Sequence, residues 1–140
     1  MKIAIGSDHR GFAHKTYIKQ HCSLAQWVDV GTYNDTRTDY PLYAAKVVDL
    51  MLAGRVDCGV LLCGSGIGMA IFANRRPGIY AGVVWNSDIA RQAKEEDNAN
   101  IVVLPSDFVS HEQSVEIIQV WLSATFKGGR YAQRLAMIDQ

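Results

Sequence analysis

Apolar residues follow two alternating patterns along the whole chain. Short runs of largely consecutive apolar residues predict strands at 2–6, 26–31, 58–63, 79–85 and 100–104. Between these runs, apolar residues return every three or four positions, which predicts helices at 11–23, 41–53, 66–74, 87–96 and 112–124. Strands that are apolar on consecutive positions are typical of a parallel sheet that helices cover on both faces. We therefore expect an α/β fold, a doubly wound three-layer sandwich with a five-stranded parallel sheet.

Length and composition narrow the class of protein. The 140 residues fit one domain, 1–140, and 49% hydrophobic residues are enough to form a core. Charged residues make up 20% of the chain and the formal net charge is +0, which argues against disorder and against an electrostatic surface for nucleic acid or anionic membranes. No run has the length and hydrophobicity of a signal peptide or a membrane span, so we expect a soluble, cytoplasmic protein.

The three cysteines, Cys22, Cys58 and Cys63, argue against two kinds of site. They are odd in number and lack both CxxC spacing and nearby histidine pairs, so neither a disulfide framework nor a structural zinc site is expected. We therefore expect reduced thiols and no bound metal.

Glycines at alternate positions follow one of these thiols, in the stretch Cys63-Gly64-Ser65-Gly66-Ile67-Gly68. A backbone without side chains can expose several N–H groups to an anion or a developing oxyanion, and the helix that begins nearby adds a positive dipole end. The stretch lacks the lysine of a nucleoside-triphosphate loop. It also differs from a dinucleotide fingerprint, because it follows the third strand and its last glycine comes one residue early. A tight turn with a buried, inert cysteine stays open as the alternative.

The place of Cys63 at the end of a strand favours chemistry. Bare amides and a helix N-terminus can lower the pKa of a thiol from about 8.5 toward neutrality. A cysteine nucleophile for acyl transfer needs a histidine in reach, but His14, His21 and His111 fall on the first and last predicted helices. A thiolate base that removes a carbon-bound proton beside a carbonyl fits better, because the adjacent amides would stabilise the enediolate oxygen.

Asp8, His9 and Arg10 follow the first predicted strand and gather a carboxylate, an imidazole and a guanidinium. Ligands of doubly wound sheets bind at the carboxyl ends of the strands, so we expect these side chains at the same crevice as Cys63. The plainer alternative is an aspartate that caps a helix, with solvated neighbours.

Two charged segments lie later in the chain. Residues 94–100, KEEDNAN, place carboxylates and amides before the fifth strand, and we expect Glu96 and Asp97 at the crevice side in an acid/base or hydroxyl-binding role. Arg130 and Arg134 are four residues apart on one face of a short predicted helix, and two guanidinium forks can bind a phosphate together. In both segments a solvated charged face is the alternative.

Five ordered motifs cover nearly the whole chain: GSDHRGF, VDVGTYNDTRTDYPLYA, GVLLCGSGIGMAIFANRRPGI, NAN and FKGGRYAQR. With them the chain resembles the sugar-phosphate isomerase family that contains ribose-5-phosphate isomerase type B and the galactose-6-phosphate isomerase subunits. The resemblance implies a Rossmann-like domain in a homodimer or tetramer, with active sites between subunits and the tail, 126–140, packed on a neighbour. It also implies aldose–ketose isomerisation of a phosphorylated sugar, ribose 5-phosphate to ribulose 5-phosphate in the pentose phosphate pathway, without metal, nucleotide or other cofactor.

The resemblance also implies roles for individual residues. Cys63 would be the base that moves a proton between the first two sugar carbons, beside Ser65, where the family often has threonine. The enediolate would lie against Gly64, Ser65, Gly66, Ile67 and Gly68. Contacts to sugar and phosphate would come from Asp8, His9, Arg10, Tyr40 and Asp97, and phosphate contacts from a neighbouring subunit would come from Arg130 and Arg134.

The chain departs from the family in two places. Glu96 stands where a histidine is expected to open the sugar ring, and Asp107 stands where an arginine often binds phosphate. In one explanation, a homo-oligomer uses Glu96 or Asp97 as the ring-opening acid/base, because burial and neighbouring carboxylates can raise the pKa of a carboxyl toward neutrality. In another, a paralogous subunit provides the histidine in a hetero-oligomer of the galactose-6-phosphate type. A catalytically silent sugar-phosphate binding protein is the third reading.

Overall fold

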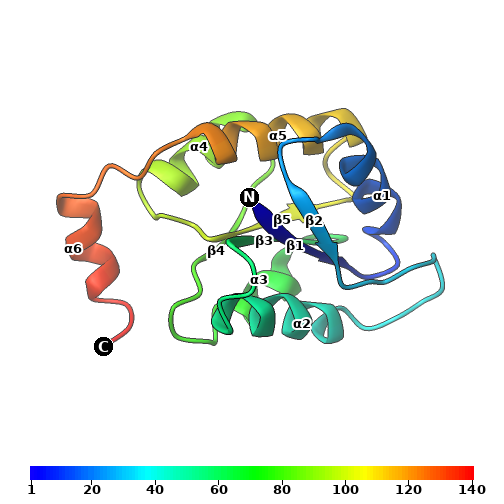
Figure 1. Ribbon diagram of the computed structural model, residues 1–140, viewed down its shortest axis with the longest axis horizontal. Helices are drawn as coiled ribbons and strands as arrows, with labels where there is room; N and C mark the ends of the chain where they lie inside the picture. Colours follow the sequence, from blue (N-terminus) through cyan, green and yellow to red (C-terminus); the bar gives the residue numbers. More distant parts are fainter.

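The centre of the molecule is a sheet of five parallel strands, seen in a computed structural model that describes residues 1–140 (Figure 1). The strand order across the sheet is β2-β1-β3-β5-β4. The strands are β1 (Lys2–Ser7), β2 (Gln26–Asp29), β3 (Cys58–Cys63), β4 (Ala81–Val83) and β5 (Ile101–Pro105).

Helices cover both faces of the sheet. In Figure 1, α1, α4 and α5 lie above it and α2 and α3 lie below it, while the last helix, α6, stands at the left end of the molecule. The helices are α1 (Phe12–His21), α2 (Tyr40–Leu52), α3 (Ile67–Ala73), α4 (Ser87–Glu95), α5 (His111–Ser123) and α6 (Arg130–Ala136). None of them is both long enough and apolar enough to cross a membrane.

The predicted α/β architecture is confirmed. Each expected strand and helix is present, and the sheet is parallel and doubly wound. The largest difference in length is at β4, which the apolar run 79–85 predicted to be longer than Ala81–Val83. β4 is the edge strand, and it pairs with β5 alone, so fewer of its residues have a ladder partner.

The core consists of two hydrophobic clusters, one on each face of the sheet. All six residues of β3 are buried, and neighbours along it face opposite clusters: Val60 and Leu62 belong to the cluster under α1, α4 and α5, while Leu61 and Cys63 belong to the cluster under α2 and α3. This arrangement explains why consecutive positions of the strand are apolar. It also turns the Cys63 side chain toward the α2–α3 face.

A crevice is expected where the chain leaves β1 and β3. These two strands are neighbours, but β1 leads to α1 on one face and β3 leads to α3 on the other. Doubly wound sheets bind their ligands at such a reversal, beyond the carboxyl ends of the strands. Asp8, just after β1, is linked to β3 there, because its N–H donates to the Leu62 carbonyl (3.3 Å).

A buried ion pair fixes the segment that leaves β2. Lys15 of α1 is only 1% exposed, and its Nζ lies 2.5 Å from Oδ1 of Asp29, while Nζ of the more exposed Lys19 lies 2.7 Å from Oδ2. Oδ1 of Asp29 also accepts the Gly31 N–H (2.9 Å). Burial lowers the pKa of Lys15, and its hydrogen bond with Asp29 opposes that change. Asp29 therefore joins α1 to the loop that leads to Tyr40.

Replacing Lys15 should therefore destabilise the fold far more than replacing Lys19. Lys15→Met leaves a largely buried carboxylate with one cation instead of two, and we expect a loss of about 3 kcal/mol in the free energy of unfolding. Lys19→Met is the matched control, with an expected loss below about 1 kcal/mol, because Lys19 is 37% exposed. Urea denaturation followed by circular dichroism measures both, and equal losses would contradict the assigned role of Lys15.

Candidate active site

Cys63 ends β3 and starts a tight turn into α3. The Gly66 N–H donates to its Sγ (3.2 Å), and the side chain is 5% exposed. Gly66 has a left-handed backbone with φ +77, and a Cβ there would lie 3.2 Å from side-chain carbons of Val83 and Val103. Glycine is therefore required at this position both by its φ and by the close packing of the turn against β4 and β5.

The expectation that the turn lowers the pKa of Cys63 is wrong. Burial raises the pKa of the thiol, and this effect exceeds the lowering by the N–H groups of Met69, Gly66 and Ser65. The charge of Asp8 raises the pKa further. The alternative of a buried cysteine, left open by the sequence, is correct about the burial of the sulfur, which the hydrocarbon of the α2–α3 face encloses.

The other two glycines of the loop make room for side chains of the protein itself. A Cβ at Gly64 would lie 2.5 Å from both Nε and Nη1 of Arg10. A Cβ at Gly68 would lie 2.8 Å from the hydroxyl oxygen of Tyr40. The loop of residues 64–68, called the glycine loop below, is thus bordered by a guanidinium on one side and a phenol on the other.

Asp8 and His9 hold the neighbouring loops in place. Oδ1 of the buried Asp8 accepts the N–H groups of Arg10 (2.9 Å) and Gly11 (3.2 Å), which shapes the turn before α1; the N-cap of that helix is Gly11. Nδ1 of His9 accepts the Thr38 N–H (3.2 Å), so neutral His9 carries its proton on Nε2. Thr38 was not singled out from the sequence, and it ties the loop before Tyr40 to the site.

Ser65 and Ile67 are the exposed residues of the glycine loop. Oγ of Ser65 accepts the Ile67 N–H (3.2 Å) and stabilises the turn. The Ile67 side chain is 58% exposed, so only its backbone can take part in a cradle at Cys63.

Asp107 follows β5 and pairs with Arg10. Oδ2 of Asp107 contacts Nη2 of Arg10, and the Asp107 N–H donates to the Gly64 carbonyl (3.0 Å). The negative charge of Asp107 expected from the sequence therefore lies at the carboxyl edge of the sheet, but the guanidinium of Arg10 balances it.

Two buried hydroxyls at this edge were missed by the sequence analysis. Oγ of Ser7 and Oγ of Ser106 have no hydrogen-bond partner in the chain, and both residues are buried. Ser7 is the last residue of β1 and Ser106 directly follows β5, so they flank β3. A polar residue at the carboxyl end of an apolar strand is the signal that could have found them. Buried hydroxyls without partners are candidates for contact with a ligand.

The expectation that Glu96 and Asp97 lie at the crevice side is wrong within one chain. α4 starts near the carboxyl edge of the sheet and runs back, so its C-cap, Glu96, lies at the amino edge just before β5 begins. Cys63 pairs with Pro105 at the other end of β5. The length of β5, roughly 13 Å at about 3.3 Å per residue, separates the two groups.

The tail lies at this same amino edge. The Lys127 N–H donates to the Glu95 carbonyl (2.9 Å), and the Lys127 ammonium pairs with the Glu95 carboxylate (2.9 Å). The pKa of Arg130 is raised mainly by its hydrogen bond with Tyr131, and the charge of Glu96 contributes. α6 thus presents Arg130 and Arg134 in the neighbourhood of Glu96, at the opposite edge from Cys63.

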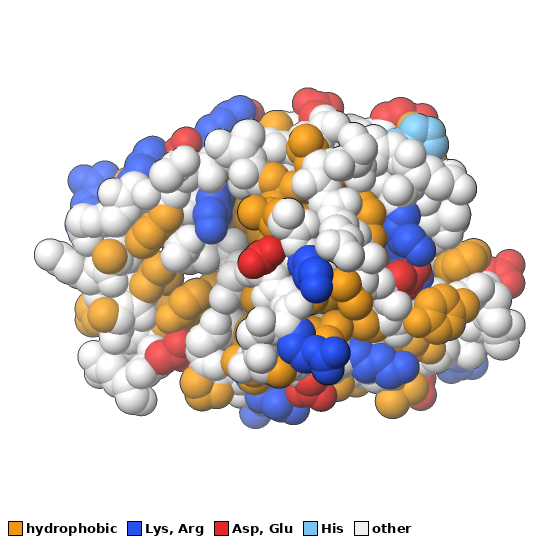
Figure 2. Space-filling model, viewed as in Figure 1, with side chains coloured by type: hydrophobic (Ala, Val, Ile, Leu, Met, Phe, Trp, Pro, Cys, Tyr) orange, Lys and Arg blue, Asp and Glu red, His pale blue; other side chains and the backbone are white.

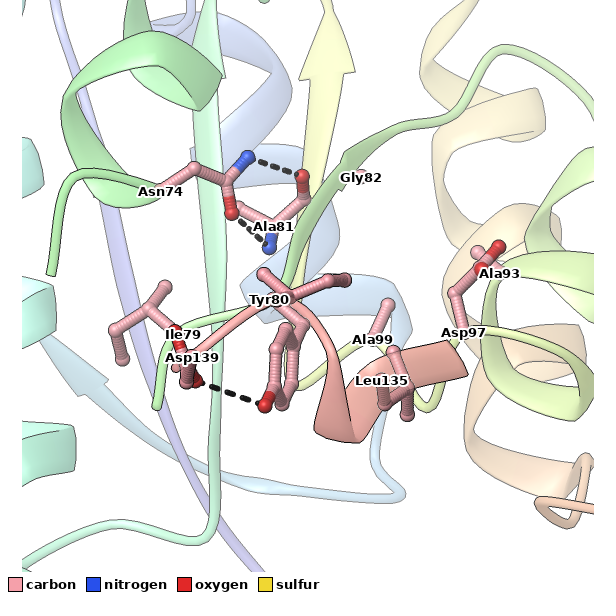
Figure 3. Close-up of a pocket in the computed structure, with 11 residues that line it drawn as sticks. Asn74, Ile79, Tyr80, Ala81, Gly82, Ala93, Asp97, Ala99, Leu135 and Asp139 are labelled. Atoms are coloured by element: carbon pink, nitrogen blue, oxygen red, sulfur yellow. Dashed lines mark hydrogen bonds between the residues drawn. The ribbon is translucent and has the colours of Figure 1, made fainter. Parts of the chain in front are cut away.

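A cavity of about 340 Å³ opens between the tail and the β4 edge (Figure 3). Asp97, Tyr80 and Leu135 line it, and the Tyr80 hydroxyl donates to Oδ2 of Asp139 (2.9 Å). Figure 2 shows hydrophobic side chains gathered at the left end of the molecule, on the α6 side. Among the tail residues, Met137 and Ile138 are largely exposed.

The site residues expected from the sequence therefore form two groups. The carboxyl-edge group consists of Asp8, His9, Arg10, Tyr40, Cys63 and the glycine loop. The amino-edge group consists of Glu96, Asp97, Arg130 and Arg134. The first group combines a thiol, backbone N–H donors, a guanidinium and a phenol, which together can move a proton on carbon and stabilise a developing oxyanion. No three His, Cys, Asp or Glu side chains are grouped as they would be to hold a metal ion.

Comparison with known proteins gives matches over nearly the full length. The family model described as Ribose/Galactose Isomerase matches residues 3–138. Ribose-5-phosphate isomerase B of Escherichia coli (strain K12) is 38% identical over 139 residues, which cover 98% of this chain and 93% of that protein.

Solved structures agree in fold. The crystal structure of a ribose 5-phosphate isomerase from Thermotoga maritima superposes with a TM-score of 0.96 at 44% identity, over 99% of this chain and 97% of that one. Ribose-5-phosphate isomerase B from Mycoplasma genitalium, solved with bound ribulose-5-phosphate, has a TM-score of 0.91 at 36% identity, over 98% of this chain and 93% of that one.

Proposed function

The chain belongs to the ribose/galactose isomerase family, and we propose that it interconverts ribose 5-phosphate and ribulose 5-phosphate. The observation that carries this proposal is the position of Cys63, whose sulfur lies at the carboxyl end of β3 within reach of the Gly66 N–H. A base beside fixed backbone donors suits the removal of a proton next to a carbonyl.

In the proposed reaction, Cys63 acts as a thiolate on the open-chain sugar. The sulfur takes the proton from C2 of the aldose, and the electron pair of that C–H bond forms a C1–C2 double bond while the carbonyl oxygen becomes an enediolate oxygen. The same proton returns from sulfur to C1, and the oxygen on C2 becomes the ketone as its own proton moves to the oxygen on C1. Atoms and electrons balance without an oxidant or a reductant.

The groups around the glycine loop supply the electrostatics of this step. Backbone N–H groups of the glycine loop would stabilise the developing oxygen charge, while Arg10, whose guanidinium lies beside Gly64, would contact the phosphate. Tyr40 offers a hydroxyl beside Gly68. Hydrogen-bond donors that are already in place before the reaction stabilise the developing charge without reorganising. Such preorganisation accounts for most of the rate enhancement at sites of this kind.

The amino-edge group would complete the site of a second copy of the chain. Arg130 and Arg134 would bind the phosphate of the neighbour's substrate, and Glu96 or Asp97 would exchange protons during ring opening. Ile67, Trp85 and Phe108 are exposed apolar residues that follow β3, β4 and β5, so they lie at the carboxyl edge of the sheet, where the proposed neighbour would cover them. The proposed enzyme is therefore a homo-oligomer with a dimer as its smallest unit.

The purified protein should convert ribose 5-phosphate to the ketose, and Cys63→Ala should reduce kcat by about 10²- to 10⁴-fold because the proton acceptor is lost. Cys58→Ala is the matched control, since Cys58 is a buried thiol of the same strand that faces the other cluster, and burial raises its pKa to about 12. A coupled ketose assay measures both variants. Ketose formation that survives Cys63→Ala would remove Cys63 from the mechanism.

The pH dependence should follow the raised pKa of the Cys63 thiol. Only the thiolate accepts the proton, so kcat/KM should rise about tenfold between pH 7.5 and 8.5 and should reach no plateau below pH ~8.5. Initial rates across that range, corrected for the ionisation of the substrate, provide the measurement. A plateau reached below pH 7.5 would mean that the pKa of the base is lowered rather than raised.

Mixing two inactive variants should restore activity if the site lies between subunits. Cys63→Ala and Arg134→Ala should each be strongly impaired alone. After mixed refolding, half of the dimers contain one chain of each kind, and one of their two sites has both residues intact, so about one quarter of wild-type activity should return. Mixtures that stay as inactive as their components would contradict a site that takes Cys63 from one subunit and Arg134 from the other.

A further inference from the structure

An ion pair at the carboxyl edge of the sheet joins two segments that are far apart in sequence. Arg10 follows β1 and Asp107 follows β5, and these strands pair with β3 on its two sides. Nη2 of Arg10 contacts Oδ2 of Asp107. The pair therefore spans the carboxyl end of β3, beside the residue that follows Cys63.

Both partners of the pair also contact Gly64. The Asp107 N–H donates to the Gly64 carbonyl (3.0 Å). The guanidinium occupies the space that a side chain at position 64 would fill, with Nε and Nη1 both 2.5 Å from the place of a Cβ. Arg10 thus rests on the glycine loop, while the chain's own carboxylate occupies one of its nitrogens.

We propose that Asp107 limits the affinity of the site for phosphorylated substrates by occupying Arg10, an inference that rests on the proposed function. A phosphate that reaches Arg10 meets a guanidinium whose charge a carboxylate already balances. The phosphate competes with Asp107 for the same N–H donors, and Asp107 repels it. Asp107 acts through Arg10, so it sets affinity and is not a catalytic residue.

Asp107 has two opposing effects on phosphate binding. Its ion pair holds the Arg10 guanidinium in place, which favours binding, and its negative charge repels the phosphate, which weakens binding. The side chains of Arg10 and Asp107 are 54% and 38% exposed. An ion pair this exposed stabilises the position of the Arg10 side chain by no more than about fivefold. A phosphate dianion bound to Arg10 lies roughly 6 Å from the carboxylate, and repulsion at that distance in water weakens binding about tenfold. Repulsion is the larger effect, so Asp107 weakens binding on balance.

The test compares wild type with Asp107→Asn and with Asp49→Asn, a matched control in which another exposed, ion-paired aspartate loses its charge. Calorimetry measures the binding of inorganic phosphate, and steady-state kinetics with ribose 5-phosphate gives KM and kcat. Asp107→Asn should tighten phosphate binding and lower KM, each on the order of threefold, with kcat within about twofold of wild type. About 0.5 M NaCl should remove most of the difference, because salt screens charges that solvent reaches. Asp49→Asn should behave as wild type.

Asp107→Ser serves as a second variant, and circular dichroism reports the folding of each protein. Weaker phosphate binding or a higher KM in the folded variants would mean that Asp107 only holds Arg10 in place, and the inference would be overturned. Values equal to wild type would overturn it as well. If wild type forms no ketose, the proposed function fails instead, and the phosphate calorimetry still decides the role of Asp107.

Discussion

The arrangement at the end of β3 depends on the absence of side chains at three alternate positions of one turn. The left-handed φ of Gly66 lets the chain reverse so that its N–H points back to the Cys63 sulfur. Gly64 and Gly68 leave the spaces that Arg10 and Tyr40 occupy. A side chain at Gly64 would displace Arg10, and a side chain at Gly68 would displace Tyr40. The glycines therefore serve the approach of the protein's own side chains as well as that of a ligand.

Burial of the thiol is unfavourable for the base proposed here, but its kinetic cost is moderate. Each unit by which the pKa of Cys63 rises reduces the thiolate population tenfold. The remaining thiolate is a stronger base, and with a Brønsted slope of about 0.5 its reactivity rises about threefold per unit. The net loss is thus about threefold per unit. In exchange, the same low-polarity surroundings would strengthen the interaction between the backbone N–H groups and the enediolate oxygen of the proposed reaction.

The sequence predicts the fold and the carboxyl-edge group well, because both depend on local patterns. Apolar strands identify the sheet, and the residues after β1 and β3 lie together once the strands are parallel. Glu96 and Asp97 are misplaced within one chain, because their nearness to β5 in sequence does not reveal that α4 runs back across the sheet before they are reached. The contact between Arg10 and Asp107 could not be predicted either, because it depends on the lengths and conformations of two separate loops.

The distribution of charge links substrate affinity to assembly in the proposed enzyme. At the carboxyl edge Asp107 balances Arg10, and the buried Asp8 adds a negative charge, so one chain alone offers little positive potential to a phosphate dianion. The unpaired guanidiniums that could offset this deficit, Arg130 and Arg134, lie at the other edge, beyond the length of β5. A chain of this topology cannot bring its two edges together by folding, since the strands between them are rigid. In the proposed homo-oligomer a second copy would supply the missing charge, so tight binding of the phosphate and formation of the subunit interface would become a single requirement.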